Sequence, residues 1–193
     1  MPRRTPLREE MEKWQEEELE DRVVRLGTDL CRALESCRRR TIVHMDIKPE
    51  NIYVTSDGDY CLGGFDSAVN LGQSNGRLSR RGTPNYMAPE LYKGEDIRDF
   101  NAASLVDQYS LGELLYYAAN GMRLPFYPRD TQVFSADTRD AAFTRRISGD
   151  KLPPPENVSG GLQKVILRAM SYNPGDRYAT PGEMRKALEE LIR

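Results

Sequence analysis

The amino-acid sequence predicts one domain that is mainly α-helical and carries a small β-hairpin. Between residues 18 and 40, apolar residues recur every three or four positions, and residues 104–120 form the most apolar helix candidate of the chain. The hairpin is predicted by Asp57-Gly58, which stands between two short β-prone runs. A chain of 193 residues is long enough for one domain with a sizeable core and short for two.

Composition and charge argue against several classes of protein. The 28 basic and 30 acidic residues give a net charge of −2, which offers no case for binding nucleic acid or a membrane surface. No apolar run approaches the roughly 20 residues of a membrane helix, and the first residues lack the apolar core of a signal peptide. The three cysteines have no metal-ligand spacing, and their odd count suits a reducing compartment. We therefore expect a soluble, cytoplasmic protein.

Residues 1–40 are predicted to form the first helices. Residues 5–18 begin with Thr5-Pro6, a plausible N-cap followed by proline in the first turn, and continue as a charged helix with one buried seam. The periodic segment 18–40 predicts a second, amphipathic helix, whose apolar stripe consists of Val23, Leu26, Leu30, Leu34 and Cys37.

The hairpin organises residues 41–66. Its predicted strands are residues 52–54 and 60–62, with the segment His44-Met45-Asp46-Ile47-Lys48-Pro49-Glu50-Asn51 directly before it and Gly64-Phe65-Asp66 directly after it. A hairpin brings its two ends together. We therefore expect Asp46, Asn51 and Gly64 to converge in space.

The remainder of the chain is predicted to be a loop followed by helices. Residues 67–82 are polar, contain glycine and lack periodicity, which indicates a mobile loop. In the apolar helix 104–120, Asp107 is the one residue that does not suit the apolar pattern. Burial of its carboxylate is costly unless it is paired or capped. Further helices are expected over 137–148 and 162–169, and a last one is opened by a capping box of Thr180 and Glu183.

Two separated motifs resemble a known family. Residues 44–51 are similar to the catalytic loop of protein kinases, His-Arg-Asp-Leu-x-x-x-Asn, and residues 82–90 (Gly-Thr-Pro-Asn-Tyr-Met-Ala-Pro-Glu) to their Ala-Pro-Glu signature. The chain thus resembles the C-terminal lobe of a serine/threonine protein kinase of the bacterial Hanks type over nearly all of its length. This resemblance implies a kinase-like fold without the N-terminal β lobe, with residues 67–90 as activation segment and 91–193 as helical subdomain.

The resemblance also implies a role for each matching residue. Asp46 would be the catalytic base, Lys48 would neutralise charge on the transferred phosphoryl group, and Asn51 would ligate the magnesium of Mg-ATP. Tyr53 falls where the family places the apolar floor under adenine. Thr83 would bond near Asp46 and shape the binding of the substrate residue after the phosphoacceptor.

Three further matches imply structural roles. Glu90 and Arg177 match the buried ion pair that ties the Ala-Pro-Glu segment to the end of the lobe. Asp107 matches the helix aspartate that holds the backbone of the catalytic loop, which would resolve the cost of its burial.

The chain also departs from the family. Met45 replaces the arginine that pairs with a phosphorylated activation loop, so Ser74 and Ser79 are interpreted as ordinary loop serines. Gly64 replaces the aspartate that bridges magnesium to the β- and γ-phosphates, and glycine supplies no ligand. Asp66 could take over only if the loop were remodelled.

No Gly-x-Gly-x-x-Gly loop for covering phosphates occurs in these residues, nor is there room for a five-stranded lobe before residue 5. We expect weak ATP and Mg²⁺ binding, and an inactive or severely impaired chain. One hypothesis is an enzyme whose N-terminal lobe lies upstream or in another chain. The alternatives are a pseudokinase-like protein-interaction module and an inactive fragment. The apolar cleft would then be open to a protein partner, an N-lobe in trans or a second copy.

Overall fold

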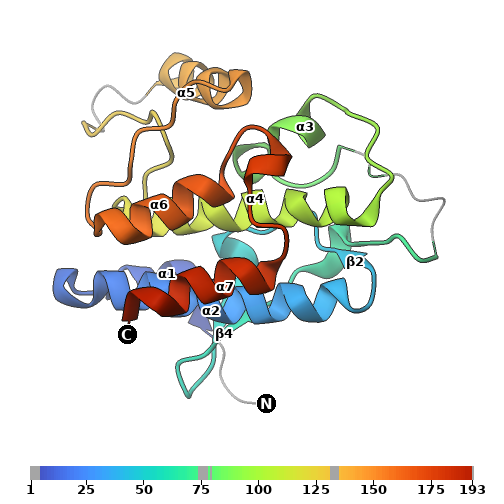
Figure 1. Ribbon diagram of the computed structural model, residues 1–193. Helices are drawn as coiled ribbons and strands as arrows, with labels where there is room; N and C mark the ends of the chain where they lie inside the picture. The colour runs from blue at the N-terminus through green and yellow to red at the C-terminus, as the bar shows by residue number, and fades with distance from the viewer. Residues whose placement is uncertain (1–4, 74–77, 79, 131–134, 193) are drawn as a thin grey trace.

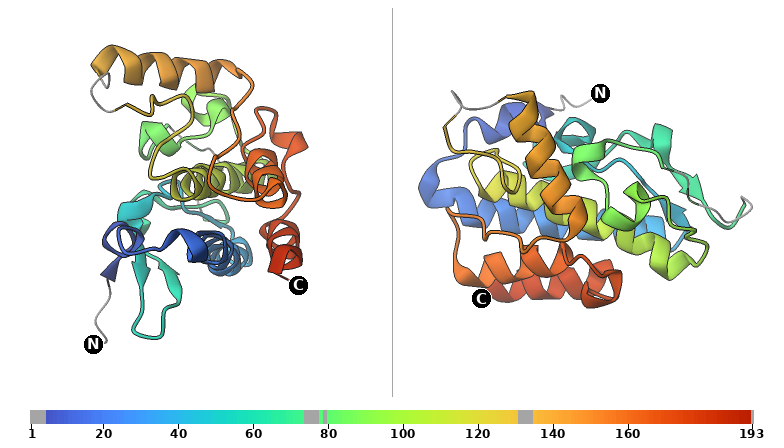
Figure 2. Two further views of the ribbon diagram at one scale, coloured as in Figure 1. Left: turned by 90° about the vertical axis from the view of Figure 1, so that its left-hand side faces the viewer. Right: turned by 90° about the horizontal axis from the view of Figure 1, so that it is seen from above.

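Long helices packed with their axes in similar directions form the body of the molecule (Figure 1). The computed structural model describes residues 5–73, 78, 80–130 and 135–192. Helix α2 (Leu19–Arg38) packs against α4 (Phe100–Ala119) and α7 (Pro181–Glu189), and α6 (Gly160–Ala169) packs against α4. These four helices are seen nearly end-on in the left view of Figure 2.

The pattern of apolar residues explains this packing. The predicted stripe of α2 is buried, whereas α4 is apolar around most of its circumference and is buried along most of its length. Gly27 lets the helices approach closely, because a Cβ at this position would lie 2.7 Å from Leu188 of α7 and 3.0 Å from Leu115 of α4.

Two small sheets flank the loop of residues 44–51. The first has the antiparallel order β1 (Thr5–Pro6), β3 (Ile52–Val54), β4 (Tyr60–Leu62), with Tyr53 opposite Cys61. The second pairs β2 (Ile42–Val43) with β5 (Val69–Asn70). The loop therefore leaves one sheet and enters the other, which fixes both of its ends.

One prediction for the N-terminal half is wrong and another is incomplete. Thr5 is no helix cap, because Thr5 and Pro6 form a strand whose partners are Val54 and Tyr53; only the short helix α1 (Leu7–Met11) follows, and then a 3-10 turn at Glu16–Glu18. The segment predicted as a mobile loop contains β5. Ser74 and Ser79 lie outside the described residues.

The helices predicted in the C-terminal half are confirmed, with earlier or better-capped starts. Helix α4 begins at Phe100, where the Asp99 carboxylate accepts the Ala102 N–H at 3.0 Å. Helix α3 (Pro89–Tyr92) follows the 82–90 motif, and α5 (Ala136–Ser148) is set apart above α4 in Figure 1. At α7 the Thr180 hydroxyl accepts the Glu183 N–H as predicted, while the Glu183 carboxylate accepts the N–H of Ala179.

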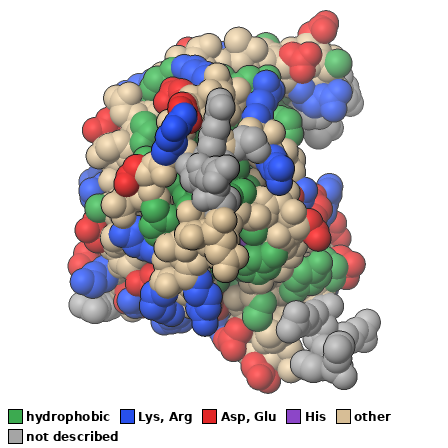
Figure 3. Space-filling view, turned by 90° about the vertical axis from the view of Figure 1, so that its right-hand side faces the viewer, with side chains coloured by type: hydrophobic (Ala, Val, Ile, Leu, Met, Phe, Trp, Pro, Cys, Tyr) green, Lys and Arg blue, Asp and Glu red, His purple; other side chains and the backbone are tan. Residues whose placement is uncertain are grey.

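Charged side chains of both signs lie on the molecular surface. On the face shown in Figure 3, acidic and basic side chains are interspersed. Among the described helices, none combines the length and apolar character needed to cross a bilayer. Cys31, Cys37 and Cys61 are free thiols.

Candidate functional site

The backbone of the 44–51 loop is held by a carboxylate from α4. Asp107 is buried, and its two carboxylate oxygens accept the N–H groups of His44 at 2.6 Å and of Met45 at 2.8 Å. Two amide donors compensate the buried charge. Asp107 thus anchors the backbone of the 44–51 loop, as the resemblance implied.

His44 links the beginning of this loop to the segment that follows the hairpin. Its Nδ1 accepts the Asp46 N–H at 3.3 Å, which leaves the hydrogen of the neutral imidazole on Nε2, where it is donated to the Gly63 carbonyl at 2.8 Å. The ring packs edge-on against Phe65, with centroids 4.6 Å apart. The two ends of the hairpin therefore meet through a buried histidine.

Side chains from separate segments converge on the Asp46 carboxylate. Thr83 Oγ1 donates to Asp46 Oδ1 at 2.7 Å, while Lys48 Nζ lies 2.8 Å and Asn51 Nδ2 3.0 Å from Oδ2. Lys48 also donates to the Thr83 hydroxyl at 2.8 Å. The structure thus brings together four of the predicted site residues.

These contacts set the protonation of Asp46. Burial is the largest single influence and acts to raise its pKa. The hydrogen bonds from Lys48, Thr83 and Asn51, together with the charge of Lys48, outweigh burial, so the pKa of Asp46 lies below its usual range. Asp46 is therefore ionised at neutral pH.

Close packing against glycine fixes the loop from the other side. Met45 adopts a left-handed conformation with φ of 72°, which is uncommon for a residue with a side chain. Gly82 has φ of 97°, and a Cβ on it would overlap the Met45 carbonyl oxygen. The start of the 82–90 motif therefore lies directly on the 44–51 loop.

Gly64 lies directly against the side chain of Asn51. Gly64 has φ of 70°, and a Cβ on it would overlap the Asn51 amide group. Asn51 Nδ2 instead donates to the Asp46 carbonyl at 2.7 Å as well as to its carboxylate. Asp46, Asn51 and Gly64 converge as predicted. Asp66 lies in the 3-10 turn Phe65–Ser67 and is exposed to solvent.

The outer face of the first sheet is the surface on which Tyr53 lies. Tyr53 is half-buried on the face opposite the buried Ile52 and Val54, and its ring lies against Gly63, where a Cβ would come within 2.9 Å. Cys61 faces the same way across the strand pair. Nearby Phe65 is 46% exposed. This side of the site is an open surface of aromatic and small side chains.

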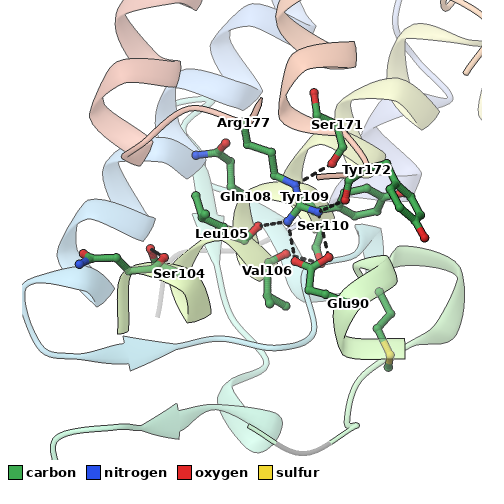
Figure 4. A network of polar contacts seen from close by, with 12 residues as sticks. Glu90, Ser104, Leu105, Val106, Gln108, Tyr109, Ser110, Ser171, Tyr172 and Arg177 are labelled. Atoms are coloured by element: carbon green, nitrogen blue, oxygen red, sulfur yellow. Dashed lines mark hydrogen bonds and ion pairs between the residues drawn. The ribbon is translucent and has the colours of Figure 1, made fainter. Parts of the chain in front are cut away.

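A buried ion pair fixes the far end of the 82–90 motif (Figure 4). Arg177 donates to both carboxylate oxygens of Glu90, at 2.6 and 2.9 Å. The same guanidinium donates to the carbonyls of Leu105 at 3.0 Å and Ser171 at 2.9 Å. The motif is thereby tied to α4 and to the segment before α7.

Comparison with known proteins decides the family. The family model described as "Protein kinase domain" matches residues 6–190. This chain belongs to the protein kinase family. It is 29% identical over 174 residues to serine/threonine-protein kinase PknB of Mycobacterium tuberculosis, covering 86% of this chain and 26% of that protein. It is 34% identical over 188 residues to serine/threonine-protein kinase Pkn1 of Myxococcus xanthus, covering 88% of this chain and 24% of that protein.

A RAC family serine/threonine-protein kinase homolog of Dictyostelium discoideum is 29% identical over 171 residues, which cover 86% of this chain and 35% of that protein. The chain thus spans about a quarter to a third of the length of these curated relatives. The bacterial matches support the predicted Hanks-type resemblance.

Kinases generally use ATP with Mg²⁺, and the donors of this chain fit only part of that metal site. Asn51 carries one amide oxygen, the Asp46 carboxylate is held by its neighbours, and Gly64 adds no side chain. In the described part of the chain, no three His, Cys, Asp or Glu residues are grouped as a metal site. As they stand, these residues do not form the two-ligand magnesium site of the family.

Sequence reasoning missed a second buried acid in α4. Glu113 is fully buried, so Asp107 is not the one residue that does not suit the apolar pattern of this helix. Glu113 Oε2 lies 3.7 Å from a guanidinium nitrogen of Arg146, which reaches it from α5. The signal was present, since a second carboxylate in so apolar a segment also requires a partner.

Proposed function

We propose that these residues form the catalytic-loop and substrate-binding part of a serine/threonine protein kinase. The observation that carries the proposal is the convergence on Asp46 of Thr83 at 2.7 Å, Lys48 at 2.8 Å and Asn51 at 3.0 Å. This convergence occurs on a loop whose backbone is anchored by Asp107. The substrates of such an enzyme are hydroxyl groups of proteins.

The chemistry proposed for Asp46 is proton acceptance. As the hydroxyl oxygen of a substrate serine or threonine bonds to the γ-phosphorus of ATP, its proton passes to Asp46 and the bond from that phosphorus to ADP breaks. The lowered pKa keeps Asp46 ionised for this role. Lys48, between Asp46 and Thr83, offers a positive charge to the transferred group, and Tyr53 offers an apolar surface to adenine.

A second candidate function is a protein-interaction module of pseudokinase type. It is favoured by Gly64, which removes a carboxylate from the metal site, and by Asn51, whose amide occupies the space where a side chain of residue 64 would begin. The open surface around Tyr53 and Phe65 would then receive a protein partner.

Phosphotransfer from Mg-ATP to protein substrates tests the two candidates. We expect the 193-residue chain alone to be inactive or severely impaired, and the chain supplied with an N-terminal kinase lobe to transfer phosphate in a manner abolished by Asp46→Asn. Turnover of the 193-residue chain that Asp46→Asn abolishes would overturn the expected impairment. Phosphotransfer by neither form, with nucleotide-independent capture of one specific partner, would establish the interaction module instead.

A further inference from the structure

Arg146 is a buried arginine of α5 whose contacts reach the 82–90 motif. Its guanidinium donates to the carbonyl of Met87 at 2.9 Å and to the carbonyl of Pro84 at 2.9 Å. It also donates to the Tyr109 hydroxyl at 3.1 Å. One side chain therefore connects α5, α4 and the segment that follows Thr83.

The position of these two carbonyls gives the contact its meaning. The 3-10 turn Pro84–Tyr86 begins directly after Thr83, whose hydroxyl bonds to Asp46. The segment is thus fixed at its start by Thr83, in its middle by Arg146 and at its end by Glu90 and Arg177. The side chains of this segment are packed, since the Tyr86 ring lies edge-on against Tyr117 and Met87 is buried, whereas Arg146 is the side chain that bonds its backbone carbonyls at Pro84 and Met87.

Arg146 makes its hydrogen bonds to groups other than the acid beside it. Glu113 is the acid that faces Arg146, yet at 3.7 Å the two form an ion pair without a hydrogen bond, and neither Glu113 oxygen has a hydrogen-bond partner among the described residues. The fixed acceptors of Arg146 are instead backbone carbonyls of the segment. A guanidinium presents planar, divergent donors, and a lysine ammonium cannot reach two such carbonyls in the same geometry.

We propose that Arg146 is a positioning residue for substrate recognition, which holds the backbone of residues 84–87 so that Thr83 and the bound substrate are aligned with Asp46. The substrate role of this segment rests on the proposed function. The positioning itself does not, because it can be measured without phosphotransfer.

Hydrogen exchange of two amides reports the proposed positioning. The Tyr86 N–H bonds to the Thr83 carbonyl at 2.9 Å, and the Met87 N–H bonds to the Pro84 carbonyl at 3.2 Å. In Arg146→Lys we expect the exchange of both amides to become at least about ten times faster, with the core amides of α2 unchanged. The matched control is Arg145→Lys on the same helix, whose guanidinium pairs with Asp150 and is half-exposed, and it should leave both amides as they are.

Two outcomes would overturn the inference: unchanged exchange at both amides, or equally faster exchange in α2, which would mean a general structural role. Should Arg146→Lys fail to fold, Tyr109→Phe removes a single bond to Arg146 and should show the same local pattern more weakly. In whichever form transfers phosphate, Arg146→Lys should raise KM for the protein substrate about tenfold with a smaller change in kcat. If phosphotransfer is absent altogether, the proposed function fails while the exchange result still decides the positioning.

Discussion

Arg177 and Glu90 form a two-pronged ion pair across 87 positions of sequence, with both side chains buried and both carboxylate oxygens bonded (Figure 4). Glu90→Gln would leave the Arg177 charge buried without its partner. We expect the free energy of unfolding to fall by about 3–5 kcal/mol, measured by urea denaturation. Arg98→Ala removes an exposed pair with Asp96 and should leave the free energy of unfolding nearly unchanged. Similar losses in the two variants would contradict the structural role of the pair.

Gly82 and Gly94 form a matched pair for testing how the 82–90 motif lies on the 44–51 loop. Both have positive φ, 97° and 75°, so alanine costs about 1–2 kcal/mol at either position from backbone strain. At Gly82 the added Cβ also overlaps the Met45 carbonyl, whereas at Gly94 nothing lies within 4 Å. We expect Gly82→Ala to destabilise the fold by at least about 1 kcal/mol more than Gly94→Ala in thermal unfolding. Equal losses of stability would show that the 44–51 loop accommodates the added Cβ without an energetic cost.

Much of the site could be predicted from sequence because it depends on local patterns. The Asp-Gly turn predicts the hairpin, and the hairpin brings Asp46, Asn51 and Gly64 together. The buried Asp107 could likewise be predicted to need partners, which are the backbone amides of the loop. Such inferences succeed because the residue type itself carries the physical requirement.

Other features could not be predicted because they depend on backbone groups distant in sequence. The acceptors of Arg146 are backbone carbonyls 59 and 62 positions away. Because every residue has a backbone carbonyl, the residue type does not show which of them accepts a hydrogen bond. The strand β1 consists of two residues whose pairing with β3 outweighs the N-cap preference of Thr5-Pro6. Tertiary contacts decided both cases.

Asp46→Asn should change how the free energy of unfolding depends on pH. The pKa of Asp46 is lowered in the folded protein, so its carboxylate contributes stability above its ordinary pKa that is lost as pH falls through the folded value. We expect the decline in unfolding free energy below about pH 4 to be shallower in Asp46→Asn than in wild type. Denaturant titrations at matched pH values measure this, and parallel curves would contradict it.

Gly64→Ala should change the pKa of Asp46 by displacing the side chain of Asn51. A Cβ at this position overlaps the Asn51 amide, whose hydrogen bond helps to lower the pKa of Asp46. Displacing Asn51 should therefore raise the pKa of Asp46, which carboxyl NMR titration would detect, and should destabilise the fold by about 1–2 kcal/mol at φ of 70°. Gly160→Ala is the control, because a Cβ there meets nothing within 4 Å. An unshifted Asp46 in Gly64→Ala would mean that Asn51 stays in place.

Glu113 should make the fold less stable as pH rises toward neutrality. Burial raises the pKa of Glu113 to about 7, against which the charge of Arg146 acts only partly. A carboxyl with a raised folded pKa contributes stability that is complete below its unfolded value near 4.5 and is lost as pH rises through 7, an effect of about 3 kcal/mol.

The measurement is the difference in unfolding free energy between wild type and Glu113→Gln from pH 4 to 8. The groups around Glu113 do not titrate in this window, since Arg146 keeps its charge and burial raises the pKa of Tyr109 to about 12. Because the remaining titrations are common to both proteins, they cancel in the difference. Relative to the variant, wild type should lose stability as pH rises. A difference independent of pH would show that Glu113 stays ionised beside Arg146 throughout.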